Sequence, residues 1–511
     1  MKKNIKDKTT RFEKFLNFVE RNGNRLPDPV TLFVAFSVII LLVSAIASML
    51  GVKAVNPADN ETVEAVNLLT SDGLVKILTE FVDVFITFPP LGLVLVVMFG
   101  IGIAESTGLT ESIMKVTIMK SPKKLVVPMI VFVGIMGNVA GDAAFIVIPP
   151  LAAMVFYSLN RHPLAGLALG YASVAGGFTA NLLINTTDVV LVGFTQSAAE
   201  LIDPSYVANP AMNYYFITAS TVMLIPLAVW INNKLVEPHL GNYNNKIEDI
   251  DLTSEITAKE KKALICSMVS VVIFIILLLI SLLPEGAPLR NPETGAMIDG
   301  SPFMASIVPL TMLLFFIPSV IYGLLAGKFK SDKDIVQHLN KAISGMGTFI
   351  VFALVASQMI AFFNWSNLGL IISIKCANFI EGIGLKGLPL ILLFILISSL
   401  INILISSNAA KWAILSPIFV PMFMLMNIDP ALTQVAYRIG DSITNPITPM
   451  MAYFIMVLTF ARKYESNIGI GRFMSLLIPY SIVFAIGWII FIIIWYVIGI
   501  PIGPGYGINL K

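Results

Sequence analysis

The chain has 511 residues, of which 57% are hydrophobic and 13% charged, and its formal net charge is +2. Soluble domains carry about 25% charged residues, so this composition excludes an ordinary soluble protein. The nearly neutral balance gives no indication of a nucleic-acid partner. Cys266 and Cys376 both lie in apolar stretches, so neither a disulfide nor a cysteine metal site is predicted.

Hydrophobic runs of about 20 residues, long enough to cross a bilayer core, follow a basic, polar segment at residues 1–28. The first run is too long for a signal-peptide core and is predicted to be retained as a helix. The predicted spans are residues 29–51, 85–106, 213–235, 262–283, 302–327, 344–363 and 474–499. Two longer spans, 164–195 and 431–461, are interrupted by polar, Gly or Pro residues, and residues 364–386 are expected at the interface.

The distribution of Lys and Arg predicts the orientation, because cytoplasmic loops carry an excess of positive residues. Basic clusters at residues 2–14, 115–124, 259–262, 328–333 and 462–472 are expected inside, and the acidic segment 52–83 outside. The assignment is consistent only if residues 125–160 and 388–427 each enter and return on one side. We therefore predict an all-α polytopic membrane protein with nine crossings and two re-entrant hairpins, entering from opposite faces.

This topology divides the chain into seven parts. They are a cytoplasmic N-terminal segment (1–28), first scaffold helices (29–124), a first hairpin and broken-helix repeat (125–235), a cytoplasmic loop (236–261), second scaffold helices (262–387), a second hairpin and broken-helix repeat (388–499) and an extracytoplasmic tail (500–511).

The two repeats align at an offset of 267 residues. The alignment pairs Ala143 with Ala410, Pro150 with Pro417, Phe156 with Phe423, Asn160 with Asn427 and Pro163 with Pro430. Because the two hairpins are predicted to enter from opposite faces, the repeat has inverted topology. Broken, polar segments at matching places in two halves are the best sequence pointer to the binding site of a secondary transporter.

Five charged residues fall at bilayer depth in these repeats: Asp142, Asp188, Lys411, Arg438 and Asp441. Each costs about 2.5–3.5 kcal/mol on insertion scales, so partners are required. Arg438 and Asp441 are three residues apart and can pair on one helix face. The alternatives are a structural ion pair and a cation or proton site at Asp441.

The hairpin tips and helix breaks provide the other candidate ligands. Asp142 and Asn408 are predicted N-caps of the returning hairpin arms, where a helix N-terminus would favour a carboxylate. Side-chain oxygens suit a sodium ion, and the candidates are Asn138, Asn402, Ser406, Ser407 and Asn408. Asn181 lies in the first break, and Pro446 and Pro449 interrupt the second. Trp412, beside Lys411, is expected either to stack on an aromatic ring or to belong to the core.

The signature from Asn22 to Pro29, the run from Asn181 to Asp188, and Trp412, Pro430, Arg438, Asp441 and Pro449 together resemble the p-aminobenzoyl-glutamate transporter (AbgT) family over nearly the whole chain. The resemblance implies a homodimer of nine-helix protomers with two hairpins, within the elevator-type ion transporters. It also implies coupling to sodium or protons, with p-aminobenzoyl-glutamate imported or sulfonamides exported. Asp188, Trp412, Pro430, Arg438, Asp441 and Pro449 match functionally important positions of the family. Ala409 departs from it, because serine is expected there.

The sequence therefore predicts a cation-coupled symporter of an aromatic dicarboxylate in the bacterial inner membrane, with its N-terminus inside. Predicted substrate-binding residues are Asn181, Asp188, Asn408, Lys411, Trp412, Arg438 and Pro449, and predicted cation-binding residues are Asn138, Asp142, Asn402 and Asp441. A sodium ion is expected at Asn402 and Asp441, and no other cofactor. The alternatives are proton-driven sulfonamide efflux, an ion channel and an intramembrane enzyme; the chain has no soluble catalytic motif, which disfavours the enzyme.

Overall fold

The computed structural model describes residues 29–55, 61–141, 143–243, 257–298, 300–405, 407–448 and 451–510. The predictions for the N-terminal segment 1–28, for Asp142, for Ser406 and for Pro449 lie outside these ranges. The described part is mainly helical, with one antiparallel strand pair in which Ala54 is opposite Val63.

The elements before the first repeat are α2 (Pro29–Met49), β1 (Lys53–Val55), β2 (Thr62–Glu64), α3 (Ser71–Ile86), α4 (Pro89–Thr107) and α5 (Leu109–Met119). The first repeat contains α6 (Val126–Met136), η1 (Gly137–Ala140), α7 (Ala143–Ser158), α8 (Pro163–Gly176), η2 (Gly177–Thr179) and α9 (Thr186–Ala199). It is followed by α10 (Tyr214–Ile231), η3 (Asn232–Val236) and α11 (Glu237–Leu240).

The middle of the chain forms α12 (Ala258–Ile280), α13 (Pro302–Ala305), α14 (Ile307–Ala326), α15 (Asp332–Ser344), α16 (Gly347–Trp365) and α17 (Leu368–Gly382). The second repeat contains α18 (Leu388–Leu404), α19 (Asn408–Leu425), α20 (Pro430–Thr444), η4 (Asn445–Ile447) and α21 (Ala452–Arg462), and α22 (Ile470–Ile498) completes the helices.

Eight helical segments of the described chain are long and apolar enough to cross a membrane. They are Pro29–Met49, Ser71–Thr107, Tyr214–Leu240, Ala258–Ile280, Ile307–Ala326, Gly347–Trp365, Asn408–Leu425 and Ile470–Ile498. The two broken spans are not among them because η2 and η4 divide each into shorter pieces. The count of nine crossings and the re-entrant path of the hairpins therefore stay predictions.

The two repeats fold alike where the sequence aligns them. Asn160 and Asn427 both have left-handed backbone, with φ of 55° and 60°. In each case the next N–H donates back to a phenylalanine carbonyl, Arg161 to Phe156 at 2.8 Å and Ile428 to Phe423 at 2.9 Å. This six-to-one bond is part of the Schellman helix ending, and asparagine tolerates the left-handed conformation better than most residues. The matched asparagines therefore end α7 and α19 in the same way.

The helices that follow these turns lie at the centre of the molecule. Every residue of α8 and every residue of α20 is buried. Helix α8 packs against α6 and α7, and α20 packs against α18, α19 and η2. Each begins with a proline and breaks into a 3-10 turn at its far end, η2 after α8 and η4 after α20. Both helix breaks are thus placed inside protein, where irregular backbone is tolerated at membrane depth.

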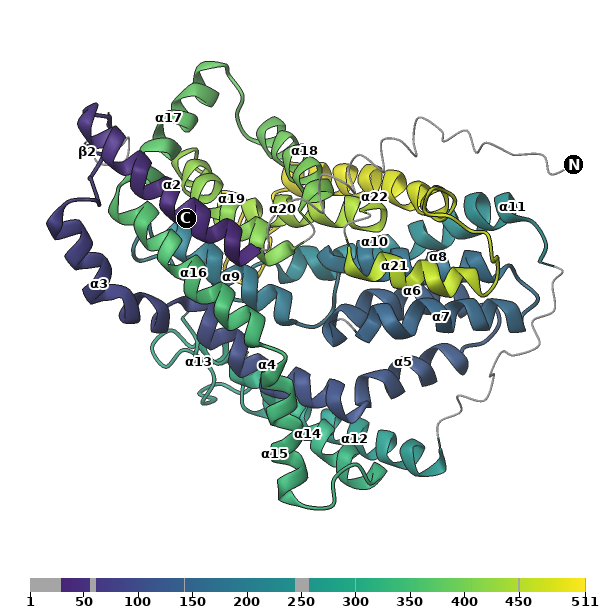
Figure 1. Cartoon of the computed structure of the whole chain (residues 1–511). Coiled ribbons are helices and arrows are strands. Elements are labelled where there is room, and N and C mark those ends of the chain that lie inside the picture. Colours follow the sequence, from purple (N-terminus) through teal and green to yellow (C-terminus); the bar gives the residue numbers. More distant parts are fainter. Residues whose placement is uncertain are drawn as a thin grey trace, which may run out of the picture.

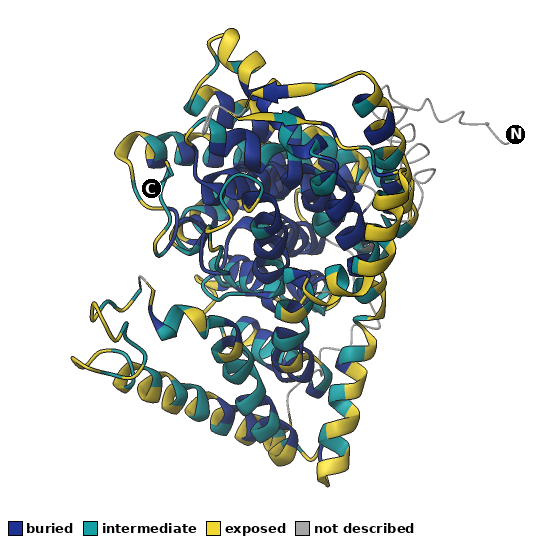
Figure 2. Ribbon diagram, turned by 90° about the vertical axis from the view of Figure 1, so that its left-hand side faces the viewer, coloured by how far each residue is buried: buried dark blue, intermediate teal, exposed yellow. Residues whose placement is uncertain are grey.

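The remaining helices surround this core unevenly. Helices α12, α14 and α15 lie together at the bottom of Figure 1, next to α4. Figure 2 shows buried residues concentrated in the upper bundle, whereas the lower helices are mostly intermediate or exposed. In α12, buried positions are confined to Ala263, Leu264 and Ser267 near its start, and Ile273, Ile276 and Leu277 are exposed. An outward aliphatic surface of this kind suits contact with lipid.

Candidate functional site

Asp188 and Arg438 form a buried ion pair between the two repeats. An Arg438 Nη1–Asp188 Oδ1 hydrogen bond of 2.5 Å joins side chains that are 3% and 1% exposed. The second guanidinium nitrogen donates to the carbonyl of Phe178, in the η2 break, at 2.8 Å. Asp188 also accepts from the backbone N–H of Asn185 at 2.8 Å, and this reciprocal capping box holds the start of α9. Arg438 therefore connects α20 to both sides of the first helix break.

Lys411 and Asp441 form a second buried ion pair, within the second repeat. The Lys411 ammonium donates to the Asp441 carboxylate and to the amide oxygen of Asn402. The other carboxylate oxygen of Asp441 accepts from the Asn445 amide at 3.2 Å. The predicted pairing of Arg438 with Asp441 is therefore wrong. Three-residue spacing makes two side chains neighbours on a helix, but partners from α9 and α19 approach these two charges and pair with them instead.

Asn402 is positioned by close contact between α18 and α20. At Gly440 of α20, a Cβ would lie 2.7 Å from the carbonyl oxygen of Ile395, so the approach requires glycine. The Asn402 amide then reaches across to the Asp441 carbonyl at 2.9 Å, the Thr444 hydroxyl at 2.8 Å and Asn445 Oδ1 at 2.7 Å. Side-chain oxygens of Asn402 in α18 and Asp441 in α20 thereby meet at the Lys411 ammonium, while Thr444 and Asn445 hold the amide nitrogen of Asn402.

Asn138 has a corresponding place in the first repeat. Its amide donates to the carbonyls of Ile135 at 3.0 Å and Val174 at 3.1 Å. Its nitrogen lies where a Cβ at Gly177 would approach within 2.9 Å. Each hairpin thus places an asparagine against the helix break of its own repeat. Among the described residues Asn138 donates to neither Asn402 nor Asp441, so its hydrogen bonds do not join the predicted cation ligands of the two repeats.

Trp412 is completely buried, so in this structure it belongs to the hydrophobic core. Its ring stacks on Tyr437 with centroids 4.6 Å apart, and its indole N–H donates to the Thr195 hydroxyl at 2.9 Å. Gln434 donates to the same hydroxyl at 2.7 Å. Sequence reasoning missed Tyr437, Thr195 and Gln434, since an isolated aromatic or polar residue within an apolar helix has no distinctive spacing.

Asn408 is the first residue of α19 and not its cap. The preceding Ser407 is the N-cap, and its hydroxyl accepts from the N–H of Ala410 at 3.4 Å. Asn408 instead offers its carbonyl to the Tyr437 hydroxyl at 2.7 Å. The predicted cap is therefore one residue too late, because serine and asparagine are both strong caps and the local sequence does not choose between them.

Two buried donors at the first break have no hydrogen-bond partner within the described residues. They are the Arg438 Nε and the Asn181 Nδ2, on side chains that are 3% and 1% exposed overall. The oxygen of Asn181 is occupied, accepting from the N–H groups of Leu182 and Leu183 at 2.9 and 3.1 Å. An unsatisfied buried donor costs about 1–3 kcal/mol, so both groups favour binding an acceptor from outside the chain.

The four charges balance: Asp188 and Asp441 are negative, and Arg438 and Lys411 are positive. Taking one charge out of water costs several kcal/mol unless a partner with good geometry compensates. A fifth charge entering this site would leave it unbalanced. Among the described residues, no three His, Cys, Asp or Glu side chains gather as a metal site. The Lys411 ammonium is held by one carboxylate oxygen and one amide oxygen, and oxygen ligands of this kind suit a hard monovalent ion.

A cavity of about 670 Å³ reaches the first hairpin from the side of α4 and α15. It is lined by Gly141 and Ala143 of the hairpin, by Thr186 in the first turn of α9, and by Glu105 and Lys341 opposite them. Its volume is within the range of about 300–1,000 Å³ for small-molecule sites. Thr186 and Asp188 are both in the first turn of α9, so the cavity approaches the helix end that carries the Asp188–Arg438 ion pair.

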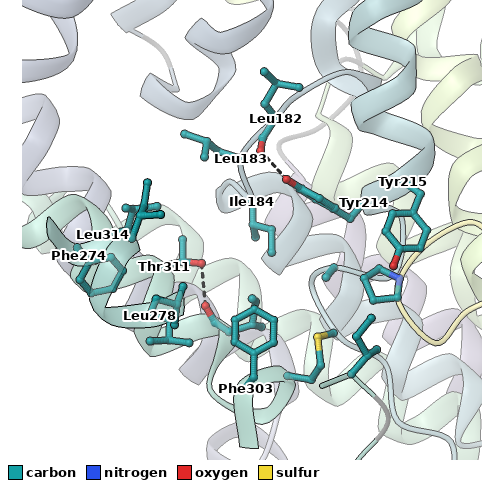
Figure 3. Close-up of a pocket in the computed structure, with 17 residues that line it drawn as sticks. Leu182, Leu183, Ile184, Tyr214, Tyr215, Phe274, Leu278, Phe303, Thr311 and Leu314 are labelled. Carbon is teal, nitrogen blue, oxygen red and sulfur yellow. Dashed lines mark hydrogen bonds between the residues drawn. The ribbon is translucent and has the colours of Figure 1, made fainter. Parts of the chain in front are cut away.

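A second cavity, of about 410 Å³, lies elsewhere and is almost wholly apolar. Figure 3 shows it between the loop at Leu182–Ile184, the start of α10, and the α12 and α14 helices. The Tyr214 hydroxyl donates to the Leu182 carbonyl at 3.0 Å, and the lining residues that the structure describes include no charged side chain. The electrostatics therefore favour the cavity at Thr186 as the route for a charged solute.

Comparison with known proteins gives one consistent result. A model of the AbgT transporter family matches residues 14–510. The chain is 35% identical over 492 residues to the p-aminobenzoyl-glutamate transport protein of Escherichia coli strain K12, covering 96% of each. The crystal structure of the YdaH transporter of Alcanivorax borkumensis matches with a TM-score of 0.89 at 37% identity, covering 94% of this chain and 100% of that one. MtrF of Neisseria gonorrhoeae, from a class of antimetabolite efflux pumps, matches with a TM-score of 0.91 at 43% identity, covering 96% of this chain and 100% of that one. The predicted polytopic helical fold and family resemblance are confirmed.

Proposed function

The chain belongs to the AbgT family of membrane transporters, and on this premise we propose that it is a cation-coupled secondary transporter of p-aminobenzoyl-glutamate or a related aromatic dicarboxylate. The observation that carries the proposal is the pair of buried cations, Lys411 and Arg438, at the helix breaks of the two repeats. Discontinuous helices at a repeat interface are where secondary transporters bind anionic substrates and coupling ions.

The carboxylates of the substrate would be recognised by donors that the protein leaves available. Arg438 Nε and Asn181 Nδ2 are buried near the first break, and the first turn of α19 is joined to α20 by the bond from the Tyr437 hydroxyl to the Asn408 carbonyl. A carboxylate oxygen would satisfy these donors, and charge-assisted hydrogen bonds are about twice as strong as neutral ones. The aromatic ring of the substrate would stack either on Trp412, once that side chain became accessible, or on Phe178, which is half-buried at the break.

Asn402 and Asp441, with Thr444 and Asn445, would hold the coupling cation. Their oxygen atoms are the ligands that a sodium ion prefers, and a monovalent ion matches the single carboxylate among them. Sodium is therefore the favoured coupling ion and protons the alternative. Asp188 would remain paired with Arg438 and set the orientation of the guanidinium group toward the substrate.

The proposed setting is a bacterial inner membrane, with the N-terminus in the cytoplasm and two copies of the chain in a homodimer. Alternating access would come from movement of the hairpin-bearing repeats against scaffold helices within residues 29–106 and 262–363. The cavity beside Thr186 would then open to the cytoplasm, because α15, which contributes Lys341 and Ala342 to its lining, follows the basic loop at residues 328–333 that is expected inside.

Efflux of sulfonamide antimetabolites is the second candidate, favoured by the similarity to MtrF over 96% of the chain. Both functions would use the same site and would differ in the ion gradient that drives transport and in the direction of transport. A channel is disfavoured, since buried ion pairs close the centre of the described bundle.

The test is reconstitution into liposomes, with uptake of labelled p-aminobenzoyl-glutamate followed under an imposed sodium gradient and then a proton gradient. We expect sodium-driven uptake that the Asp441→Ala variant loses. Uptake under a proton gradient alone would replace sodium by protons. No flux of this substrate under either gradient, with folded protein, would contradict the proposal and place sulfonamide efflux first.

A further inference from the structure

We propose that Lys411 is a tethered internal cation that occupies the coupling-ion site and alternates with a sodium ion, so that ion binding and substrate binding depend on one side chain. The inference rests on the proposed function and adds a mechanism of coupling to it. It starts from a single geometric fact: the Lys411 ammonium is bound by Asp441 Oδ1 and Asn402 Oδ1, the same two atoms that serve best as sodium ligands.

A lysine at this position is expensive to bury. Its side chain has no exposed surface and is held by one carboxylate and one amide oxygen. Replacing a buried ion pair by apolar groups is often neutral or stabilising, so the pair is weak evidence for a purely structural role. An ammonium ion and a sodium ion carry the same charge and compete for the same oxygen atoms. Sodium can therefore bind Asp441 only if Lys411 leaves.

The released ammonium then requires a new anion. Lys411 is in the first turn of α19, whose N–H groups and positive dipole end also favour a carboxylate. A substrate carboxylate at this hairpin tip would pair with the displaced ammonium. The flexible four-carbon stem of lysine permits such a movement, whereas the planar arginine fork is suited to fixed geometry.

Charge balance makes the two events depend on each other. The Asp188, Asp441, Arg438 and Lys411 charges sum to zero, so sodium alone would leave the site at +1 and a dicarboxylate substrate alone at −2. Bound together, the two ligands leave it at −1, a smaller imbalance than the substrate creates alone. Because an uncompensated buried charge is costly, each ligand should bind more tightly when the other is present, which is the reciprocal coupling that symport requires.

The experiment measures sodium binding to the purified full-length protein without substrate, by calorimetry and by sodium-dependent thermal shift at pH 8. The variant is Lys411→Gln, which removes the internal cation but retains a polar side chain. If Lys411 occupies the site at least nine-tenths of the time, removing it should tighten sodium binding by at least about tenfold. Sodium should increase the affinity for p-aminobenzoyl-glutamate less in this variant than in the wild type, because no ammonium is released to pair with the substrate; this affinity is measured separately by calorimetry.

Lys386→Gln is the matched control, since Lys386 is an exposed lysine paired with Glu381 on the surface. It should bind sodium as the wild type does. If Lys411→Gln fails to fold, Lys411→Arg retains the charge, and its sodium affinity should be no tighter than that of the wild type while the substrate still binds. Unchanged or weaker sodium binding in folded Lys411→Gln would overturn the inference, even where wild-type liposomes show sodium-driven uptake. Absence of wild-type uptake would instead contradict the proposed function.

Discussion

The ion pair between Asp188 and Arg438 gives a quantitative test of how the two repeats are held together. Asp188→Asn removes the negative charge but keeps an oxygen that can accept from the Asn185 N–H, so the capping box of α9 is preserved. Arg438, only 3% exposed, is left as an unpaired buried cation. Breaking a buried pair in this way costs about 3–5 kcal/mol of the free energy of unfolding.

The assay is a double-mutant cycle on detergent-purified protein, with unfolding in denaturant followed by circular dichroism. Asp188→Asn and Arg438→Gln should each lower the free energy of unfolding by about 3–5 kcal/mol, because each leaves one buried charge alone. The double variant should lose no more free energy of unfolding than either single variant, because it contains neither charge and so leaves no buried charge unpaired. Its uptake of p-aminobenzoyl-glutamate should nevertheless stay low, because Arg438 also supplies the donor proposed for the carboxylate.

If the double variant loses as much free energy of unfolding as the two single variants together, to within about 0.5 kcal/mol, the two residues are independent and the proposed pairing is refuted. A double variant that regains both stability and uptake would show that Arg438 only supports the structure. Leu278→Ile, which is in the apolar cavity of Figure 3, is a suitable control that should leave the cycle unchanged.

Substitutions at three further places test the local geometry. Gly177→Ala places a methyl group 2.9 Å from the Asn138 amide nitrogen, so it should lower the free energy of unfolding by about 1–3 kcal/mol and slow uptake. The control is Gly92→Ala, where a Cβ would meet no atom of another described element within 4 Å. It should be neutral in thermal unfolding or stabilise the protein by up to about 1 kcal/mol. Trp412→Phe keeps the ring stack and loses the indole N–H, which donates to both the Thr195 hydroxyl and the Leu191 carbonyl, at a cost of about 1 kcal/mol. Trp412→Ala should cost about 3–5 kcal/mol, and similar unfolding midpoints for the two would contradict the core assignment. At Asn160 and Asn427, glycine should be tolerated, because both backbones are left-handed. Alanine should lower the free energy of unfolding by about 1–2 kcal/mol at either position. A loss of stability at only one of the two positions would count against their equivalence.

The sequence was informative wherever the cause is local. Hydrophobic length identifies the spans, and the Asn160–Asn427 and Pro163–Pro430 matches identify helix ends, because a left-handed turn and a fixed proline φ depend on a few adjacent residues. It did not reveal the amphipathic helix α3 in the acidic segment 52–83. The charged residues there indicate only the outer side of the membrane, whereas the helix formed by Ser71–Ile86 depends on its folded surroundings.

The charged residues at bilayer depth were also evident in advance, but their partners were not. Helical spacing placed Arg438 beside Asp441, and a helix-surface pair of this kind contributes only about 0.2–0.5 kcal/mol. In the folded chain Arg438 pairs with Asp188, 250 residues away, and Asp441 pairs with Lys411. The requirement that every buried charge has a partner follows from the sequence and the membrane. Which partner it finds depends on how α9, α19 and α20 pack, because electrostatic pairing acts through space and only the tertiary structure sets those distances.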